Sequence, residues 1–72
     1  MVNITEIGIT AGDIWHYLDD YSSATLAELQ EKLDKSQELI LLSLGWLARE
    51  GHILLEDANN GFKAELTQKQ KK

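Results

Sequence analysis

An Asn60-Gly61 pair near the C-terminal end of the chain separates two short segments in which apolar and polar residues alternate. These segments cover about residues 53–57 and 62–66. An Asn-Gly pair favours a type I′ turn, because both central residues of that turn need a positive φ, and such a turn joins antiparallel strands directly. The sequence therefore predicts a two-stranded hairpin at this end of the chain.

The residues before the hairpin carry the apolar spacing of helices. Thr10 is the expected N-cap of the first helix, and that helix is expected to end near Asp20. Ile9 and Ile14 would then pack against each other across the cap. Apolar side chains alternate along residues 1–9, and this pattern is compatible with either a short strand or an extended arm.

Two further helices are marked by their capping residues. A T-x-x-E capping box from Thr25 to Glu28 opens the second helix. Ser36 is the expected N-cap of the third helix, which spans about residues 37–50, and Gly51 follows at a position that favours a left-handed backbone. One face of the second helix carries the apolar residues Leu26, Leu29 and Leu33.

The order of these elements defines the expected architecture. A loop at Ser22 and Ser23 joins the first helix to the second, a short turn joins the second to the third, and the hairpin follows. This is the winged helix-turn-helix arrangement, a mainly α fold of three helices with a two-stranded β-hairpin as its wing. We place one domain at residues 1–66 and a disordered, lysine-rich tail at residues 67–72.

Two stretches of the chain also carry a resemblance. Ala11-Gly12-Asp13-Ile14-Trp15 in the first helix, and Leu44-Gly45-Trp46-Leu47-Ala48-Arg49-Glu50-Gly51 in the third, resemble a small family of uncharacterised prokaryotic winged helix-turn-helix proteins. The resemblance covers most of residues 7–66. It implies a stand-alone cytoplasmic domain with a fold associated with DNA binding, and it carries over no catalytic or binding residue.

The distribution of charge disfavours nucleic acid as a partner. The chain has seven basic and twelve acidic residues, and three of the basic residues are the tail lysines Lys69, Lys71 and Lys72. Residues 1–66 contain the remaining four basic residues and all twelve acidic residues, so this part of the chain carries a net charge of −8. An acidic body repels the phosphates of DNA.

The chemistry of catalytic and metal sites is missing from the sequence. Cysteine is absent, and the two histidines, His16 and His52, lie on different expected elements as surface residues. Asp19 and Asp20 are adjacent on a helix, so their carboxylates diverge by about 100° and do not converge on one substrate. We therefore expect no enzyme activity, cofactor, metal or small-molecule ligand. The sequence shows neither a membrane-spanning run nor an export signal, and a cytoplasmic location is expected.

The third helix is apolar on two sides. Ile40, Leu44 and Leu47 form one stripe, which we assign to the core. Leu39, Leu42 and Trp46 form a second stripe on roughly the opposite side, and we name these three as the candidate partner-binding residues. Between the stripes, Ser43 is expected in a polar gap, and Gly45 suggests the close approach of another helix or backbone.

Three interpretations of the second stripe remain open. It can pack within its own chain, under the wing or the N-terminal arm. It can form an interface with another protein, most simply in a homodimer. It can contact the major groove of DNA, where a dimer would place Lys32, Lys35 and the lysine tails in one basic strip. The sequence favours a protein-interaction or homodimerisation module in a regulatory setting, and the alternative is a DNA-binding transcriptional regulator.

Overall fold

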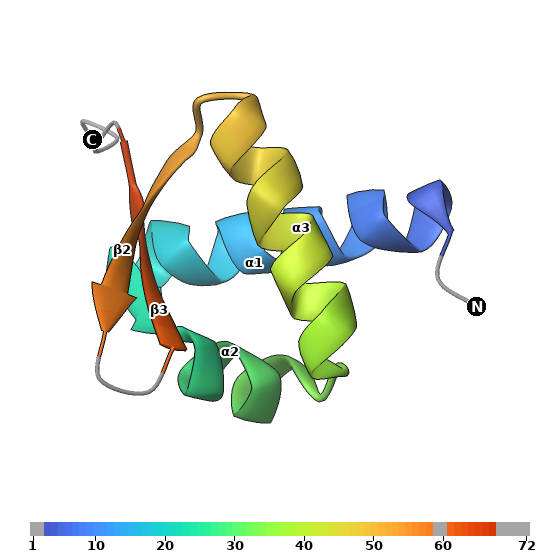
Figure 1. Cartoon of the computed structure of the whole chain (residues 1–72), viewed down its shortest axis with the longest axis horizontal. Coiled ribbons are helices and arrows are strands. Elements are labelled where there is room, and N and C mark those ends of the chain that lie inside the picture. The colour runs from blue at the N-terminus through green and yellow to red at the C-terminus, as the bar shows by residue number, and fades with distance from the viewer. Residues whose placement is uncertain (1–2, 59–60, 68–72) are drawn as a thin grey trace.

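The computed structural model describes residues 3–58 and 61–67 of the chain. It has the expected mainly α architecture, in which a hairpin follows three helices (Figure 1). In chain order the elements are α1 (Ile4–Tyr21), β1 (Ser23–Thr25), α2 (Leu26–Leu33), α3 (Gln37–Arg49), β2 (Ile53–Ala58) and β3 (Gly61–Leu66).

Helix α1 begins two turns earlier than its sequence predicted. Asn3 is the N-cap, and its side-chain oxygen accepts a hydrogen bond from the backbone N–H of Glu6 at 2.9 Å. Thr10 is therefore a buried residue inside the helix, and the predictions of an N-cap at Thr10 and of a strand or arm before it are wrong. Ala11 is buried and Ile7 is half-buried, at the helical spacing that leads to Ile14 and Leu18, and this burial favours helix over an extended arm.

Helices α2 and α3 begin where their caps predicted. The backbone N–H of Thr25 donates to Glu28 Oε1 at 2.8 Å, and the backbone N–H of Glu28 donates to Thr25 Oγ1 at 3.1 Å, which completes the capping box. Ser36 Oγ accepts from the backbone N–H of Leu39 at 3.2 Å. After α3, Gly51 adopts a φ of 82°, a left-handed conformation in which glycine has no Cβ to clash.

The hairpin belongs to a three-stranded antiparallel sheet with the strand order β1-β3-β2. Strands β2 and β3 pair from Ile53 opposite Leu66 to Ala58 opposite Gly61, as the two alternating segments predicted. The Asn60 turn itself lies outside the described residues. The short strand β1 replaces part of the loop predicted at Ser22 and Ser23. Its Ala24 is buried opposite Ala64. A strand of only three residues is too short for its alternating pattern to be recognised in the sequence.

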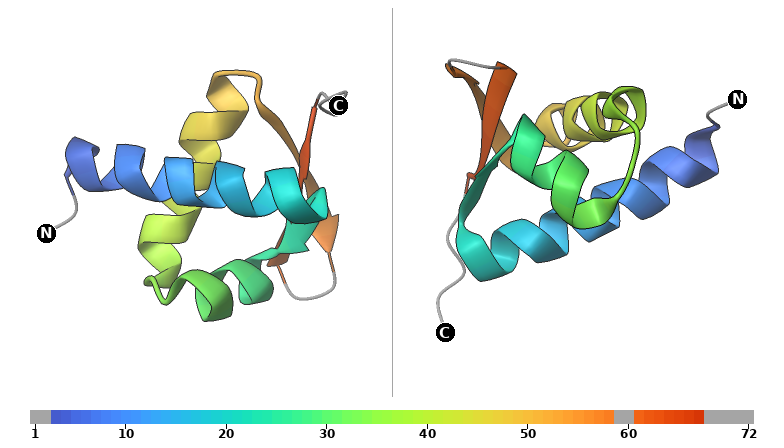
Figure 2. Two further views of the ribbon diagram at one scale, coloured as in Figure 1. Left: turned by 180° about the vertical axis from the view of Figure 1, so that it is seen from behind. Right: turned by 90° about the horizontal axis from the view of Figure 1, so that it is seen from below.

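The core lies where α1, α2 and α3 meet the inner face of the sheet. Helix α1 passes behind α3, and its N-terminal part extends beyond α3 on the side away from the wing (Figures 1 and 2). Ile40, Leu44 and Leu47 are buried, which confirms the predicted core stripe of α3. Among the described residues, no helix is long and apolar enough to cross a membrane. The other members of this core cluster are Ala11, Ile14, Leu18, Ala24, Leu26, Leu29, Ile53, Ala64 and Leu66.

Thr67 is held against the domain, although we assigned it to the tail. Its hydroxyl donates to the carbonyl oxygen of Gly51 at 2.7 Å, and its backbone N–H donates to the carbonyl oxygen of His52 at 3.0 Å. The rest of the predicted disordered tail, residues 68–72, lies outside the described residues.

Candidate protein-interaction surface

Helix α3 presents one face to the core and one to solvent. The inner face consists of Leu39, Ile40, Ser43, Leu44 and Leu47, all of which are buried. The opposite side, which we call the outer face of α3, carries the exposed residues Glu38, Leu42, Gly45, Trp46 and Arg49, with Leu41 half-buried at its edge.

The structure divides the predicted stripe of Leu39, Leu42 and Trp46 between these two faces. Leu39 is only 9% exposed and borders a small cavity together with Ile9 and Thr10 of α1. Leu42 and Trp46 are 49% and 41% exposed. Leu39 therefore belongs to the intrachain packing, whereas Leu42 and Trp46 remain available to a partner.

Ser43 marks the point where α1 crosses α3. Its side chain is fully buried, and its hydroxyl donates to the carbonyl oxygen of Ile7 at 3.2 Å. The sequence predicts Ser43 in a polar gap between the two stripes, but it lies in the buried contact between α1 and α3. A small residue at a crossing lets two helix backbones approach closely.

Gly45 has no close neighbour inside the chain. A Cβ built on it meets no other heavy atom within 4 Å. The close approach that we predicted at this glycine is therefore not made by another part of the described chain, and the space in front of Gly45 is open.

A groove of about 580 Å³ lies between α1 and the C-terminal end of α3. Trp46 lines it from α3, while Trp15 and small residues line it from α1. The sequence did not predict this juxtaposition, because it depends on how α1 crosses α3, and Gly8 lies before the predicted start of α1. A signal was present, since Gly8, Gly12 and Trp15 follow one another at helical spacing. The residues lining the groove are Gly8, Ala11, Gly12, Trp15, Trp46, Leu47, Glu50 and His52.

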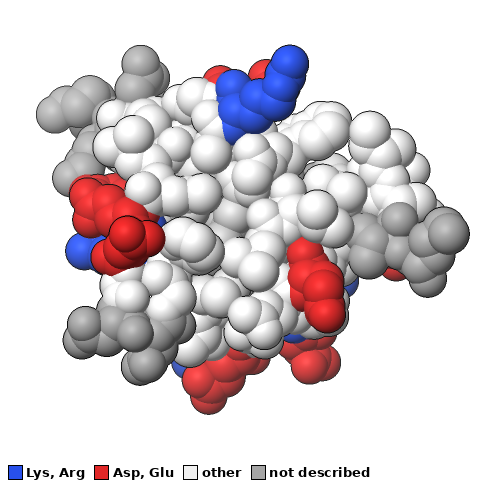
Figure 3. Space-filling view, viewed as in Figure 1, with Lys and Arg blue, Asp and Glu red and all other residues white. Residues whose placement is uncertain are grey.

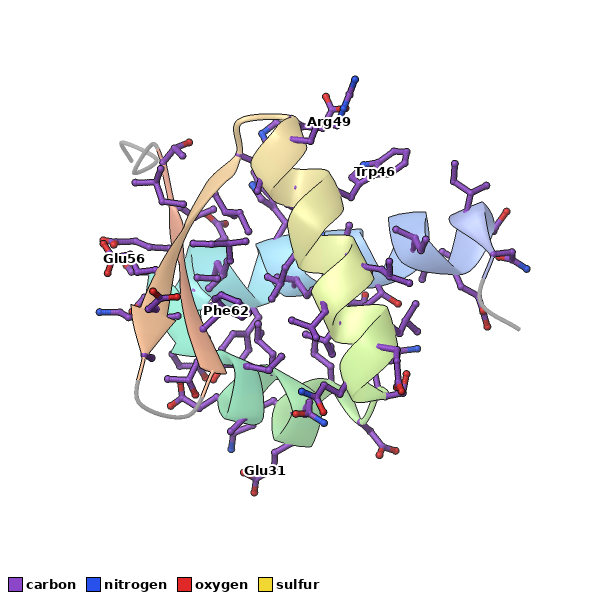
Figure 4. The ribbon with its side chains drawn as sticks, viewed as in Figure 1. Glu31, Trp46, Arg49, Glu56 and Phe62 are labelled. Carbon is purple, nitrogen blue, oxygen red and sulfur yellow. The ribbon has the colours of Figure 1, made fainter. Side chains whose placement is uncertain are left out.

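The wing adds apolar side chains next to the outer face of α3. Leu55 of β2 and Phe62 of β3 are each 39% exposed. In the strand register, Leu55 lies opposite Ala64 and therefore on the side of the sheet that faces the core. Phe62 points to that side (Figure 4).

Charged groups lie mostly around the margin of this side of the molecule, and uncharged side chains fill its middle (Figure 3). On the wing, Glu56 is paired in register with Lys63, and Glu65 and Asp57 add further negative charge. At the end of α3, the guanidinium of Arg49 lies 3.9 Å from Glu50, with 85% of the Arg49 side chain exposed. The outer face and the wing thus offer little positive charge to a phosphate backbone.

His16 lies exposed on α1 with its ring against that of Trp15, at a centroid distance of 5.9 Å. Within residues 3–58 and 61–67, no three His, Cys, Asp or Glu side chains lie close enough together to hold a metal ion.

The helices, the caps and the paired wing agree with what comparison with known proteins finds. The family model of the winged helix-turn-helix domain DUF2582 matches residues 1–66. The chain belongs to this family. The winged helix-turn-helix domain is also similar to the solution NMR structure of protein BT2368 from Bacteroides thetaiotaomicron, with 32% sequence identity and a TM-score of 0.74. That similarity covers 86% of this chain and 76% of the other. A comparison with curated proteins gives no match.

Proposed function

We propose that this winged helix-turn-helix domain is a non-enzymatic protein-interaction module, which binds its partner through the outer face of α3. The observation that carries the proposal is the exposure of Leu42 and Trp46 on the helix face that DNA-binding relatives of this fold insert into the major groove. The regulatory setting follows from the fold by analogy, and the cytoplasmic location from the sequence. Both belong to the same proposal.

The residue types of the outer face suit a protein partner better than DNA. Base edges are read by Arg, Lys, Asn and Gln side chains. Here Gln37 and Arg49 stand only at the two ends of α3, and the surface between them is formed by Leu41, Leu42 and Trp46. Aromatic anchors beside aliphatic residues are typical of the centres of protein interfaces.

Electrostatics supports the same choice. The described part of the domain holds four basic and twelve acidic residues, a net charge of −8. Affinity for DNA comes largely from neutralising phosphates, so a body of this charge opposes binding.

Sedimentation of the purified chain, with and without random-sequence duplex DNA, tests the proposal. At physiological salt we expect a non-specific dissociation constant weaker than the usual range of about 10⁻⁴–10⁻⁶ M. Sub-micromolar binding to random duplex at that salt overturns the proposal and supports a DNA-binding regulator instead.

A further inference from the structure

We propose that the partner of the outer face of α3 is a second copy of this chain, packed with its α3 antiparallel to the first about a two-fold axis. This inference rests on the proposed function and adds the identity of the partner and the register of the contact. The inference is based on the order of charged, large and small side chains along the outer face, because this order is complementary to itself when the helix is reversed.

The charges at the two ends of the outer face are opposite in sign. Glu38 lies in the first turn of α3, and Arg49 lies in the last turn. Both are exposed, and both lie on the same side of the helix as Leu42 and Gly45, because residues three and four apart share one face. The points midway between Glu38 and Arg49 and midway between Leu42 and Gly45 coincide, halfway between Ser43 and Leu44.

A two-fold axis through that midpoint pairs each of these residues with its complement. In a two-fold interface, residue i contacts residue j and residue j contacts residue i. Antiparallel packing therefore places Glu38 of each copy beside Arg49 of the other, and two interchain ion pairs form. Parallel packing would instead place like charges together, which is unfavourable.

Side-chain size follows the same symmetry. The axis that pairs the charges also sets Leu42 of one copy against Gly45 of the other. Gly45 leaves open space within 4 Å of its Cβ position, so a leucine can fill the hole that the glycine leaves. The same axis sets Leu41 against Trp46, so that every large apolar residue of the outer face meets an apolar or small one.

The contact must extend beyond α3 to be stable. A standard interface buries about 800 Å² on each partner, which is about a sixth of the 4990 Å² that this chain exposes. The wing, which carries the half-exposed residues Leu55 and Phe62, lies on one side of α3, and the groove lined by Trp46 lies on the other (Figure 4). These neighbours supply the additional apolar area that the dimer needs.

Charge reversal tests both the dimer and its register. Glu38→Arg leaves two positive ends on each copy, and Arg49→Glu leaves two negative ends. By sedimentation equilibrium at low ionic strength, we expect each variant alone to dimerise about tenfold more weakly than the wild type. An equimolar mixture of the two variants restores both ion pairs, and we expect it to recover dimerisation as a heterodimer.

Glu31→Arg is the matched control. It makes the same change in charge as Glu38→Arg, but Glu31 projects from α2 away from the outer face of α3 (Figure 4). We expect this variant to dimerise at least as well as the wild type, because it only reduces the net negative charge. Circular dichroism of all variants confirms that the helices are intact.

The outcomes separate this inference from the proposed function. A wild-type chain that stays monomeric at high micromolar concentration overturns the dimer. A wild-type dimer whose charge variants behave like the wild type, or whose mixed variants recover nothing, overturns the antiparallel register. Neither result depends on DNA, whereas the proposed function is overturned by the binding of duplex DNA.

Discussion

The two faces of α3 are made of similar residues but have different surroundings. On the inner face, Ile40, Leu44 and Leu47 are at most 5% exposed, because α1 and the sheet cover them. On the outer face, Leu42 and Trp46 are 49% and 41% exposed. Hydrophobicity therefore does not by itself show which face of a helix is core. The inner face stabilises the fold, and we assign the outer face to association.

The largest expected difference between the faces is in folding stability. Leu44→Ala removes a side chain that is 1% exposed, and we expect the free energy of unfolding to fall by about 2–5 kcal/mol. Leu42→Ala is the matched change on the outer face, and in dilute solution we expect it to cost far less. Urea denaturation at low protein concentration measures both. Equal losses would contradict the division into two faces.

The second prediction concerns association rather than folding. Trp46→Ala removes the aromatic anchor of the outer face, and we expect it to weaken dimerisation by about 2 kcal/mol. The melting temperature of this variant should depend less on protein concentration than that of the wild type, because assembly no longer adds to stability. Leu54→Ala serves as the control, since Leu54 is 54% exposed on the opposite side of the wing. An equal loss of dimer in both variants would contradict the assignment of the dimer contact to the outer face.

A smaller effect is expected where α1 crosses the inner face. Ser43→Ala deletes the hydroxyl that donates to the Ile7 carbonyl oxygen at 3.2 Å, and we expect a loss of about 1 kcal/mol of folding stability. Thr5→Ala removes a hydroxyl from the exposed side of α1 and should change stability less. Thermal unfolding followed by circular dichroism compares the two. If the Thr5 variant lost as much as the Ser43 variant, the buried hydrogen bond would contribute nothing.

The smallest expected effect is that of a change at Gly45, which should stabilise folding but weaken dimerisation. Gly45→Ala replaces an exposed glycine in mid-helix, and we expect roughly 0.5–1 kcal/mol of added folding stability in dilute solution. The same methyl group occupies the space that Leu42 of a second copy would fill, so dimerisation should weaken. Asp19→Ala is the control, because Asp19 is exposed in the last turn of α1, away from the groove and the outer face; removing an acidic residue from the end of a helix should stabilise folding without weakening the dimer. Unfolding and sedimentation of both variants give the two signs separately.

Predictions from the sequence succeeded where the signal lay within a few residues. The capping box at Thr25, the Ser36 cap and the left-handed Gly51 are all as predicted. The pairing of β2 with β3 and the core stripe of α3 also follow from spacing along the chain. These features depend on hydrogen bonds and side-chain contacts between near neighbours, which the order of residues specifies directly.

The tertiary structure alone decided what depends on distant segments. Residues 4–9 form helix because Asn3 caps them and because this part of α1 lies against α3, where Ile7 is half-buried and its carbonyl oxygen accepts from Ser43. That packing then buries Leu39 and Ser43, leaves Leu42 and Trp46 exposed, and brings Trp15 beside Trp46 at one groove. Strand β1 likewise exists only because β3 lies beside it. The sequence by itself determined the order of the elements and the two apolar sides of α3. Which residues of the second side stay exposed was decided by where α1 crosses, because burial is a property of the neighbours in space.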